Sequence, residues 1–210
     1  MNAEQCKDMF LAVADKIIDS EDYLTKIDEQ IGDGDHGSGM ALGFKNVKQE
    51  LSKAKVTSVE DVFRITGTTL LDIMGGASGV LFGTVFISGI AGRDPENDIG
   101  LKQFAEIFRK SLEALKMRGK ANIGDKTMVD AFEPAVVALE ESVTQNDGLT
   151  AGLRKAAEAA KKGMENTKKY QARFGRARYF GEKAIGLQDA GATSIWLIFQ
   201  EMADWVELNG

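Results

Sequence analysis

Apolar residues recur at intervals of three and four along most of the chain, which is the spacing of one face of an α-helix. The clearest stripe consists of Leu101, Phe104, Phe108, Leu112 and Leu115. Comparable stripes begin at Phe10, Met40, Val59, Met128, Leu149 and Trp196, and a continuous apolar run spans Val80 to Ala91. No stretch alternates apolar and polar residues with a period of two. The pattern therefore predicts about eight helices and no sheet, with the Met and Phe stripes as core.

The breaks between these helices are of two kinds. Two are plain turns, at residues 93–98 and 145–148. The others are long and rich in glycine and charge: Asp28 to Gly39, Met74 to Gly79, Arg118 to Thr127 and Phe174 to Gly191. A helical bundle does not need such loops, so four of them indicate one site at one end, where backbone approaches a ligand closely. No linker, repeat or low-complexity tract divides the chain, and we expect a single domain over residues 1–210.

One uncharged stretch, Ile73 to Gly92, has to be considered as a membrane span. Its first part is the glycine-rich segment 75–79, and the apolar part proper runs only from Val80 to Ala91. That length is too short to cross a bilayer and is typical of a buried helix.

Composition narrows the class of protein. Of the 210 residues, 43% are hydrophobic and 28% are charged, which argues against disorder and against a membrane bundle. The net charge is -6 with no basic block, so we expect neither nucleic acid nor membrane as a partner. One cysteine and one histidine exclude a disulfide within the chain and a Cys/His zinc cluster. The first ten residues carry charge and no apolar run, which favours a cytoplasmic protein without a secretory signal.

The strongest local signal is an acidic segment in which three aspartates, Asp28, Asp33 and Asp35, fall within eight residues and glycines lie between them. Hard cations such as Mg²⁺ prefer oxygen ligands and are usually shared with substrate phosphates. An EF-hand is excluded, because Gly37 and Phe44 occupy positions where its loop requires an oxygen ligand and a glutamate. From this motif alone, a metal site and a solvated acidic turn remain equally open.

Two glycine loops precede predicted helices, at residues 36–40 and 75–79. Free backbone N–H groups at a helix N-terminus attract anions, and the Ser78 hydroxyl could donate to a phosphate. Neither loop is a Walker A motif, since no Gly-Lys-Ser/Thr follows and no strand precedes. Close helix packing is the alternative for either loop taken singly.

The segments 124–128 and 188–194 also lead into predicted helices. Asp125 or Thr127 is a possible cap of the first helix. Asp189 is either the cap of the last helix or a ligand contact, with capping as the default.

Arg176 and Arg178 stand beside a flexible glycine, and either could neutralise a phosphoryl group in transit. For Arg178 alone, a surface role is favoured. His36 is the only histidine, so a Ser-His-Asp arrangement is impossible without it. Its position beside Asp35 suggests a contact to nucleotide or metal-bound phosphate, and a loop histidine without a ligand is the alternative.

Five motifs occur in order across essentially the whole chain: residues 32–37, 75–79, 124–128, 175–179 and 188–194. Together they resemble the dihydroxyacetone kinase L subunit family. The resemblance implies an all-α closed barrel of eight antiparallel helices, with nucleotide and two Mg²⁺ ions bound by loops at one end. It implies Asp28, Asp33 and Asp35 as metal ligands. It implies as nucleotide contacts His36, Gly37, Ser38, Gly39, Ala77, Ser78, Gly119, Met128, Arg176, Asp189 and Gly191, of which Arg176 is the residue expected to act on the phosphoryl group.

The resemblance also implies an activity. In this family a phosphoryl group passes from Mg-bound nucleotide to dihydroxyacetone, which is held covalently on a histidine of a separate K subunit. In one version, bound ADP is retained and is rephosphorylated by a phosphoenolpyruvate-driven phosphocarrier, the M subunit. In the other version, ATP is an exchanging substrate. Separate L chains of this length mostly resemble the first version, which we therefore expect; the oligomeric state, a homodimer included, stays open.

Several positions depart from the usual family pattern. Ser38 and Gly39 stand where the family has an apolar residue and Asn, and Lys183, Leu187 and Ala190 stand where it has Arg, His and Pro. An ATP-dependent kinase for a related keto-tetrose is therefore the second expectation. From other classes, we consider a non-catalytic nucleotide-binding regulatory module and an acidic helical scaffold without a ligand.

Overall fold

The structure is a computed structural model that describes residues 1–210, and it contains helices and no β-strand. The α-helices are α1 (Ala3–Asp19), α2 (Glu21–Asp28), α3 (His36–Lys53), α4 (Val59–Ile73), α5 (Gly76–Ile87), α6 (Leu101–Gly119), α7 (Val129–Thr144), α8 (Leu149–Asn166) and α9 (Ala190–Asn209). Two 3-10 segments, η1 (Thr167–Lys169) and η2 (Arg176–Ala184), lie between α8 and α9.

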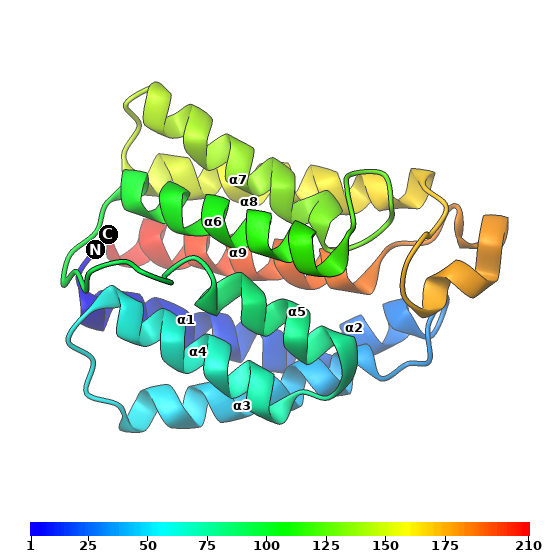
Figure 1. Cartoon of the computed structure of the whole chain (residues 1–210), viewed down its shortest axis with the longest axis horizontal. Coiled ribbons are helices and arrows are strands. Elements are labelled where there is room, and N and C mark those ends of the chain that lie inside the picture. The colour runs from blue at the N-terminus through cyan, green and yellow to red at the C-terminus, as the bar shows by residue number, and fades with distance from the viewer.

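The long helices form a closed ring. Each of α4 to α9 packs on the helix that precedes it in the chain. Helix α3 packs on α1, and α9 also packs on α1, which closes the ring. The helices follow the long axis of the molecule and successive members reverse direction (Figure 1). The expected all-α closed barrel of about eight antiparallel helices is thereby confirmed, with α2 as a short additional helix packed on α3 and α9.

Helix α2 was not expected as a separate element, because the apolar stripe from Phe10 continues to Leu24. The break comes at Ser20, whose hydroxyl donates to the carbonyl of Lys16 at 2.7 Å. A serine that bonds to the preceding turn competes with helix propagation. The chain therefore bends at this point, and α2 carries Asp28 to its own C-terminal end.

Aromatic rings fill the centre of the barrel. Every ring helix except α8 contributes a phenylalanine to one contact network, in which neighbouring ring centroids lie 5.0 to 6.5 Å apart. Helix α8 instead presents small residues. At Gly163 a Cβ atom would lie 2.0 Å from the backbone oxygen of Asp130, so α8 lies very close to α7. The expected core role of the Phe stripes is confirmed by this packing.

The apolar run Val80 to Ala91 is mostly helix α5, which has 12 residues. Its Gly83 faces α4, where a Cβ atom would lie 2.4 Å from Leu71 Cγ. Phe82, Val85 and Phe86 are buried, as expected of a core helix. No helix in the structure combines the length and the apolar character that crossing a membrane requires.

All four glycine-rich loops lie at one end of the barrel, at the right of Figure 1, and both termini lie at the other end. The reason is the alternating direction of the helices, which places the α2–α3, α4–α5, α6–α7 and α8–α9 connections on the same side. The N-termini of α3, α5, α7 and α9 consequently gather at this loop end. Each N-terminus offers free N–H groups and the positive end of a helix dipole.

Candidate metal and phosphate site

The three sequence-predicted aspartates lie together at the loop end. Asp28 is the last residue of α2, and Asp33 and Asp35 lie in the connection to α3. Their carboxylate oxygens lie within 4.8 Å of one another. The chain can bend back on itself because Gly34 has a φ of 76°, and its N–H donates to Asp28 Oδ2 at 2.9 Å. Asp28 thus shapes the loop that brings Asp33 and Asp35 close to it.

Electrostatics in this cluster is unfavourable without a cation. Partial burial, and then the neighbouring charges of Asp33 and Asp28, raise the pKa of Asp35 above its ordinary value. Arg176 supplies one positive charge, with Nε 2.7 Å from Asp33 Oδ2. Three carboxylates sharing one guanidinium form an oxygen donor set with uncompensated charge, which is the chemistry that Mg²⁺ fits. The residues present therefore suit that ion.

The loop that opens α3 divides into a packed part and an open part. At Gly37, a Cβ atom would lie 2.2 Å from Thr25 Oγ1, so this glycine allows α2 to approach α3. At Gly39, no heavy atom lies within 4 Å of a Cβ position. The Ser38 hydroxyl donates to the Asp35 carbonyl at 3.0 Å. Close packing thus accounts for Gly37, whereas Gly39 leaves room for a ligand.

His36 links this loop to the last helix. Its Nε2 lies 2.8 Å from the hydroxyl oxygen of Ser194, which is fully buried in α9. Burial lowers the pKa of His36 below its ordinary value, so the ring is neutral at neutral pH. The histidine therefore ties the start of α3 to α9.

The glycine loop at residues 75–79 also has an open part and a packed part. Gly75 and Gly76 have open space around a Cβ position, and Gly76 has a φ of 66°. Gly79 is packed, since a Cβ atom would lie 2.1 Å from the backbone oxygen of Met74. Ala77 is exposed and Ser78 half-buried in the first turn of α5. The first turn of α5 is therefore accessible to an anion.

Residues from three further segments line the loop end. Met128 is buried directly before α7, and a Cβ atom at Gly191 would lie 3.4 Å from Met128 Cβ. Gly119 is the last residue of α6, and a Cβ atom at this position would lie 3.5 Å from Leu81 Cδ2 of α5. The fold thus brings Met128 and Gly191 together from distant parts of the chain.

Asp189 caps α9, as expected by default. Its Oδ2 accepts a hydrogen bond from the Ala192 N–H at 2.7 Å. Burial raises the pKa of Asp189 to about 7, with Asp130 and Asp28 adding to the rise and Lys126 opposing it. A carboxyl group with this pKa changes its charge near neutral pH.

The loop before α7 is held by a residue that the sequence analysis missed. Asp130 accepts from the Gly124 N–H at 2.6 Å and from the Thr127 N–H at 2.7 Å. Asp125 instead accepts from the Asn122 N–H, and the Thr127 hydroxyl accepts only from the Val129 N–H at 3.2 Å. Of the two possible caps, Asp125 therefore does not cap α7, whereas Thr127 bonds to the N–H of its first residue, Val129. The spacing Thr-x-x-Asp resembles a capping box and could have indicated Asp130.

Lys126 is a second residue that was missed. It is 1% exposed, and its Nζ donates to the carbonyl of Thr167 at 2.7 Å and to that of Leu187. Burial lowers its pKa. Its acceptors are backbone atoms 41 and 61 residues further along the chain, so no local pattern reveals them.

The two arginines of η2 have different surroundings. Arg176 reaches the aspartates, whereas Arg178 lies over the exposed ring of Tyr179, with its Nη2 donating to the hydroxyl at 2.6 Å. The surface role favoured for Arg178 is consistent with this contact.

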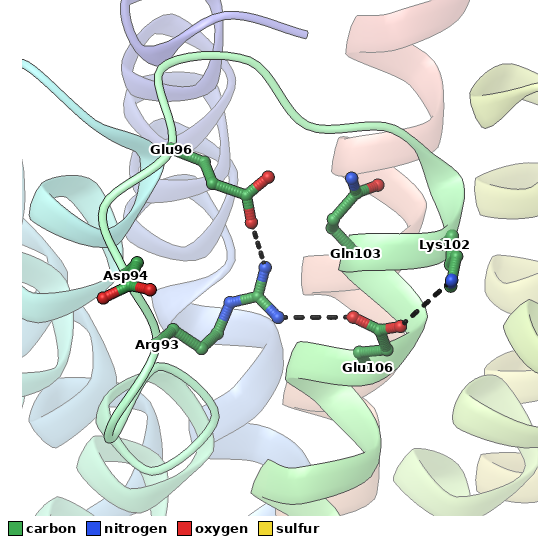
Figure 2. Close-up of a pocket in the computed structure, with 6 residues that line it drawn as sticks. All are labelled: Arg93, Asp94, Glu96, Lys102, Gln103 and Glu106. Carbon is green, nitrogen blue, oxygen red and sulfur yellow. Dashed lines mark hydrogen bonds and ion pairs between the residues drawn. The ribbon is translucent and has the colours of Figure 1, made fainter.

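A hollow of about 370 Å³ lies among charged side chains at the opposite end of the barrel (Figure 2). Arg93 points at Glu96, 2.5 Å away, and at Glu106, 3.4 Å away, and it also pairs with Glu60. The charge of Arg93 is thus balanced by carboxylates of this protein, and the ion pairs join the 93–98 turn to α4 and α6. The hollow is therefore a feature of the turn and does not compete with the loop end as a candidate site.

Comparison with known proteins identifies relatives of the chain. Residues 30–204 match the DAK2 domain. The chain is 40% identical over 182 residues to the PEP-dependent dihydroxyacetone kinase, ADP-binding subunit DhaL, of Escherichia coli K12. The matched region covers 87% of this chain and 87% of that protein. It is 34% identical over 207 residues to D-erythrulose kinase of Mycolicibacterium smegmatis, covering 95% of this chain and 35% of that longer protein.

A solved structure has a similar fold. The dihydroxyacetone kinase of C. freundii in complex with AMP-PNP and Mg²⁺ superposes with a TM-score of 0.73 at 26% identity. The match covers 94% of this chain and 33% of that one. The chain thus spans about a third of the length of that kinase.

Proposed function

The chain belongs to the dihydroxyacetone kinase L subunit family, and we propose that it is the adenine-nucleotide-binding subunit of a kinase for a short ketose. One observation carries the proposal: three carboxylates and Arg176 lie together where the N-termini of α3, α5, α7 and α9 gather. The carboxylates can hold a cation, while the helix N-termini and the guanidinium can hold phosphate. The relatives named as ADP-binding subunits support this interpretation.

In this proposal Asp28, Asp33 and Asp35 hold Mg²⁺, with two ions as the proposed number. When bound, Mg²⁺ supplies positive charge that neutralises the phosphate oxygens during transfer. The protein contributes the arrangement of ligands. Asp28 accepts N–H groups of the loop, and this fixes the relative positions of the other two carboxylates before any ion arrives.

The nucleotide phosphates would lie against the two accessible helix N-termini. The backbone N–H groups of Gly37 and Ser38 serve one of them, with His36 and Gly39 on either side, and those of Ala77 and Ser78 serve the other. Gly119, Met128, Asp189 and Gly191 surround the rest of the nucleotide in this proposal. The open space at Gly39 and Gly76 supports it, since backbone can approach a phosphate there.

Arg176 is the proposed catalytic residue. Phosphoryl transfer depends mainly on positioning and on neutralising charge, so no nucleophilic side chain is required from this chain. A guanidinium that reaches the metal-binding carboxylates can also reach a phosphate bound beside them. Arg176 would exchange its contact with Asp33 for contact with the phosphoryl group in transit.

We propose that the acceptor, dihydroxyacetone, is presented by a separate K subunit and that an M-type phosphocarrier rephosphorylates retained ADP. The 40% identical E. coli relative carries a PEP-dependent name, which supports this version. A kinase for a keto-tetrose is the second candidate. It is favoured by the match to D-erythrulose kinase and by the departures Lys183, Leu187 and Ala190 in the segment beside the site.

The test is a stepwise reconstitution. Calorimetry with Mg-ADP should show binding by the purified chain, and bound ADP should survive dialysis. The chain alone with Mg-ATP and dihydroxyacetone should form almost no triose phosphate. A K subunit should start the reaction, and the phosphocarrier with phosphoenolpyruvate should sustain it.

Each alternative gives a different result in the same assay. Faster phosphorylation of erythrulose than of dihydroxyacetone favours the keto-tetrose kinase. Nucleotide binding without transfer to either ketose indicates a regulatory module, and absence of Mg-ADP binding indicates a scaffold. Rapid turnover by the chain alone would contradict the subunit assignment.

A further inference from the structure

The segment between α8 and α9 leaves the barrel and returns to it, and one buried lysine joins its two ends. Lys126 Nζ donates to the carbonyl oxygens of Thr167 and Leu187. Thr167 directly follows α8, and Leu187 lies shortly before α9. The residues between them form an excursion, 168–186, that carries η2 and Arg176.

Two further hydrogen bonds close the base of the excursion. The Gly186 N–H donates to the Lys168 carbonyl at 2.7 Å, and the Asp189 N–H donates to the Thr167 hydroxyl at 3.1 Å. Beyond this base, the Arg173 N–H donates to the Asp125 carbonyl at 3.1 Å, and Ala172 and Ala184 pack on Ile31. The excursion therefore touches the rest of the protein at few points, and its base lies on Lys126.

The surroundings of Lys126 explain why a lysine suits this position. A buried ammonium is costly unless charge and hydrogen bonds compensate it. Two of its three donors bond to carbonyls, and the negative charges of Asp189 and Asp130 face it. An apolar side chain of equal length would fill the space but leave two backbone carbonyls without a donor.

We propose that Lys126 is a positioning residue, which holds the base of the 168–186 excursion and thereby sets Arg176 against the metal-binding aspartates. The inference rests on the proposed function, in which Arg176 acts on the phosphoryl group. Lys126 itself does not need to touch nucleotide or metal. A displacement of about 1 Å at a catalytic group can cost about a hundredfold in rate, so the base of the excursion matters for turnover.

The test compares Lys126→Met with Lys120→Met. Lys120 lies in the same loop and also has a left-handed backbone, with φ of 56° against 59° at Lys126, but it is exposed. Amide hydrogen exchange is measured on both variants without any ligand. We expect faster exchange across residues 168–186 in Lys126→Met and unchanged exchange in Lys120→Met. Unchanged exchange in Lys126→Met would overturn the proposal.

Kinetics of the complex with a K subunit then show whether Lys126 acts through Arg176. Lys126→Met should lower kcat by about a hundredfold, while Mg-ADP affinity stays near the wild-type value. Lys126→Met combined with Arg176→Ala should be no slower than Arg176→Ala alone, because the guanidinium to be positioned is already absent. Multiplying losses, or a loss of ADP affinity as large as the loss of kcat, would contradict the positioning role.

A conservative variant guards against a folding defect. Lys126→Arg keeps two donors at the same place and should recover part of kcat. If Lys126→Met does not fold, Lys126→Gln, which keeps an amide donor, takes its place in every comparison. If the wild-type complex transfers no phosphoryl group, the proposed function fails, while the exchange comparison still decides whether Lys126 holds the excursion.

Discussion

Arg176 Nε lies 2.7 Å from Asp33 Oδ2, although the two residues belong to segments near opposite ends of the chain. The side chain of Arg176 is largely exposed and that of Asp33 is about one third exposed. Such a pair contributes little to stability. Its value lies in bringing a movable cation to the place where carboxylates gather, and the following predictions use that arrangement.

The first prediction concerns the exposed carboxylates. Asp33→Asn and Asp35→Asn should each abolish Mg-dependent ADP binding, since each removes an anionic oxygen ligand, and both variants should keep the wild-type melting temperature. Calorimetry with Mg-ADP and thermal unfolding measure these two effects. Asp22→Asn, at an exposed position of α2, is the control and should bind ADP normally. Unchanged ADP affinity in Asp33→Asn or Asp35→Asn would remove the metal assignment.

Asp28 should behave differently from its two neighbours. Its Oδ2 accepts N–H groups from Gly34 and His36. Asp28→Asn should therefore lose Mg-dependent ADP binding and also about 1 kcal/mol of unfolding free energy. Urea unfolding in magnesium-free buffer measures the second loss. A variant as stable as wild type would show that these hydrogen bonds do not shape the loop.

Arg176→Ala should reduce kcat about a hundredfold to a thousandfold and weaken ADP binding much less, because a cation aimed at developing charge helps the transition state most. Steady-state kinetics of the complex with a K subunit, beside calorimetry, separates the two effects. Arg178→Ala is the matched control, since Arg178 contacts Tyr179 and not the aspartates. A fall in affinity at unaltered kcat would make Arg176 a binding contact only.

Two glycines in the first turn of α3 should have different roles, Gly37 in helix packing and Gly39 in ADP binding. Gly37→Ala should destabilise the protein by about 1–3 kcal/mol, because its Cβ atom would overlap Thr25 and the Glu21 carbonyl. Gly39→Ala has open space, so it should leave stability unchanged or slightly improved and weaken ADP binding by obstructing the phosphate approach. Thermal unfolding and calorimetry on both variants check this. Equal effects of the two changes on both measurements would contradict the division.

Stability should depend on the ionisation of Asp189. The pKa of Asp189 is about 7 in the folded protein and its ordinary value is 3.8, so the folded state binds the proton more tightly than the unfolded state. The resulting stabilisation is present below pH 3.8 and is lost as pH rises through 7. Asn also caps helices well, so Asp189→Asn should keep the cap and lack this loss. Urea unfolding in magnesium-free buffer from pH 4 to 8 should show that wild type loses unfolding free energy relative to Asp189→Asn. If the unfolding free energies of the two proteins changed in parallel with pH, the pKa of Asp189 would not be raised.

The ring of helices was predictable because burial imposes a periodic pattern on long segments. The stripe from Leu101 to Leu115 corresponds to the buried face of α6. The break at Ser20 was missed because a side-chain hydrogen bond to the preceding turn does not interrupt the apolar spacing. The segment η2 was missed because 3-10 helices follow no 3.6-residue period.

At the site, residue types were easier to predict than contacts. Asp28, Asp33 and Asp35 are neighbours in sequence, and a glycine turn brings neighbours together. Lys126 bonds to two carbonyls that no side-chain pattern marks, and Gly37 has a packing role that only the position of α2 reveals. Contacts between distant segments depend on how the helices pack, which local spacing does not encode.

Both termini lie at the end of the barrel away from the loops, where α1 begins and α9, which packs on α1, ends (Figure 1). A reporter or a second domain fused there would leave the loop end free for a large partner. The two ends are not equivalent as attachment points. The Met1 ammonium donates to Asp98 Oδ1 and to the Ile99 carbonyl, both at 2.9 Å, whereas Leu208 and Gly210 are exposed. Fusion after Gly210 therefore preserves these contacts. Fusion before Met1 would remove the ammonium and its charge, while the backbone hydrogen bonds from Ala3 N–H to the Asn97 carbonyl and from Ile99 N–H to the Met1 carbonyl would still join α1 to the α5–α6 connection.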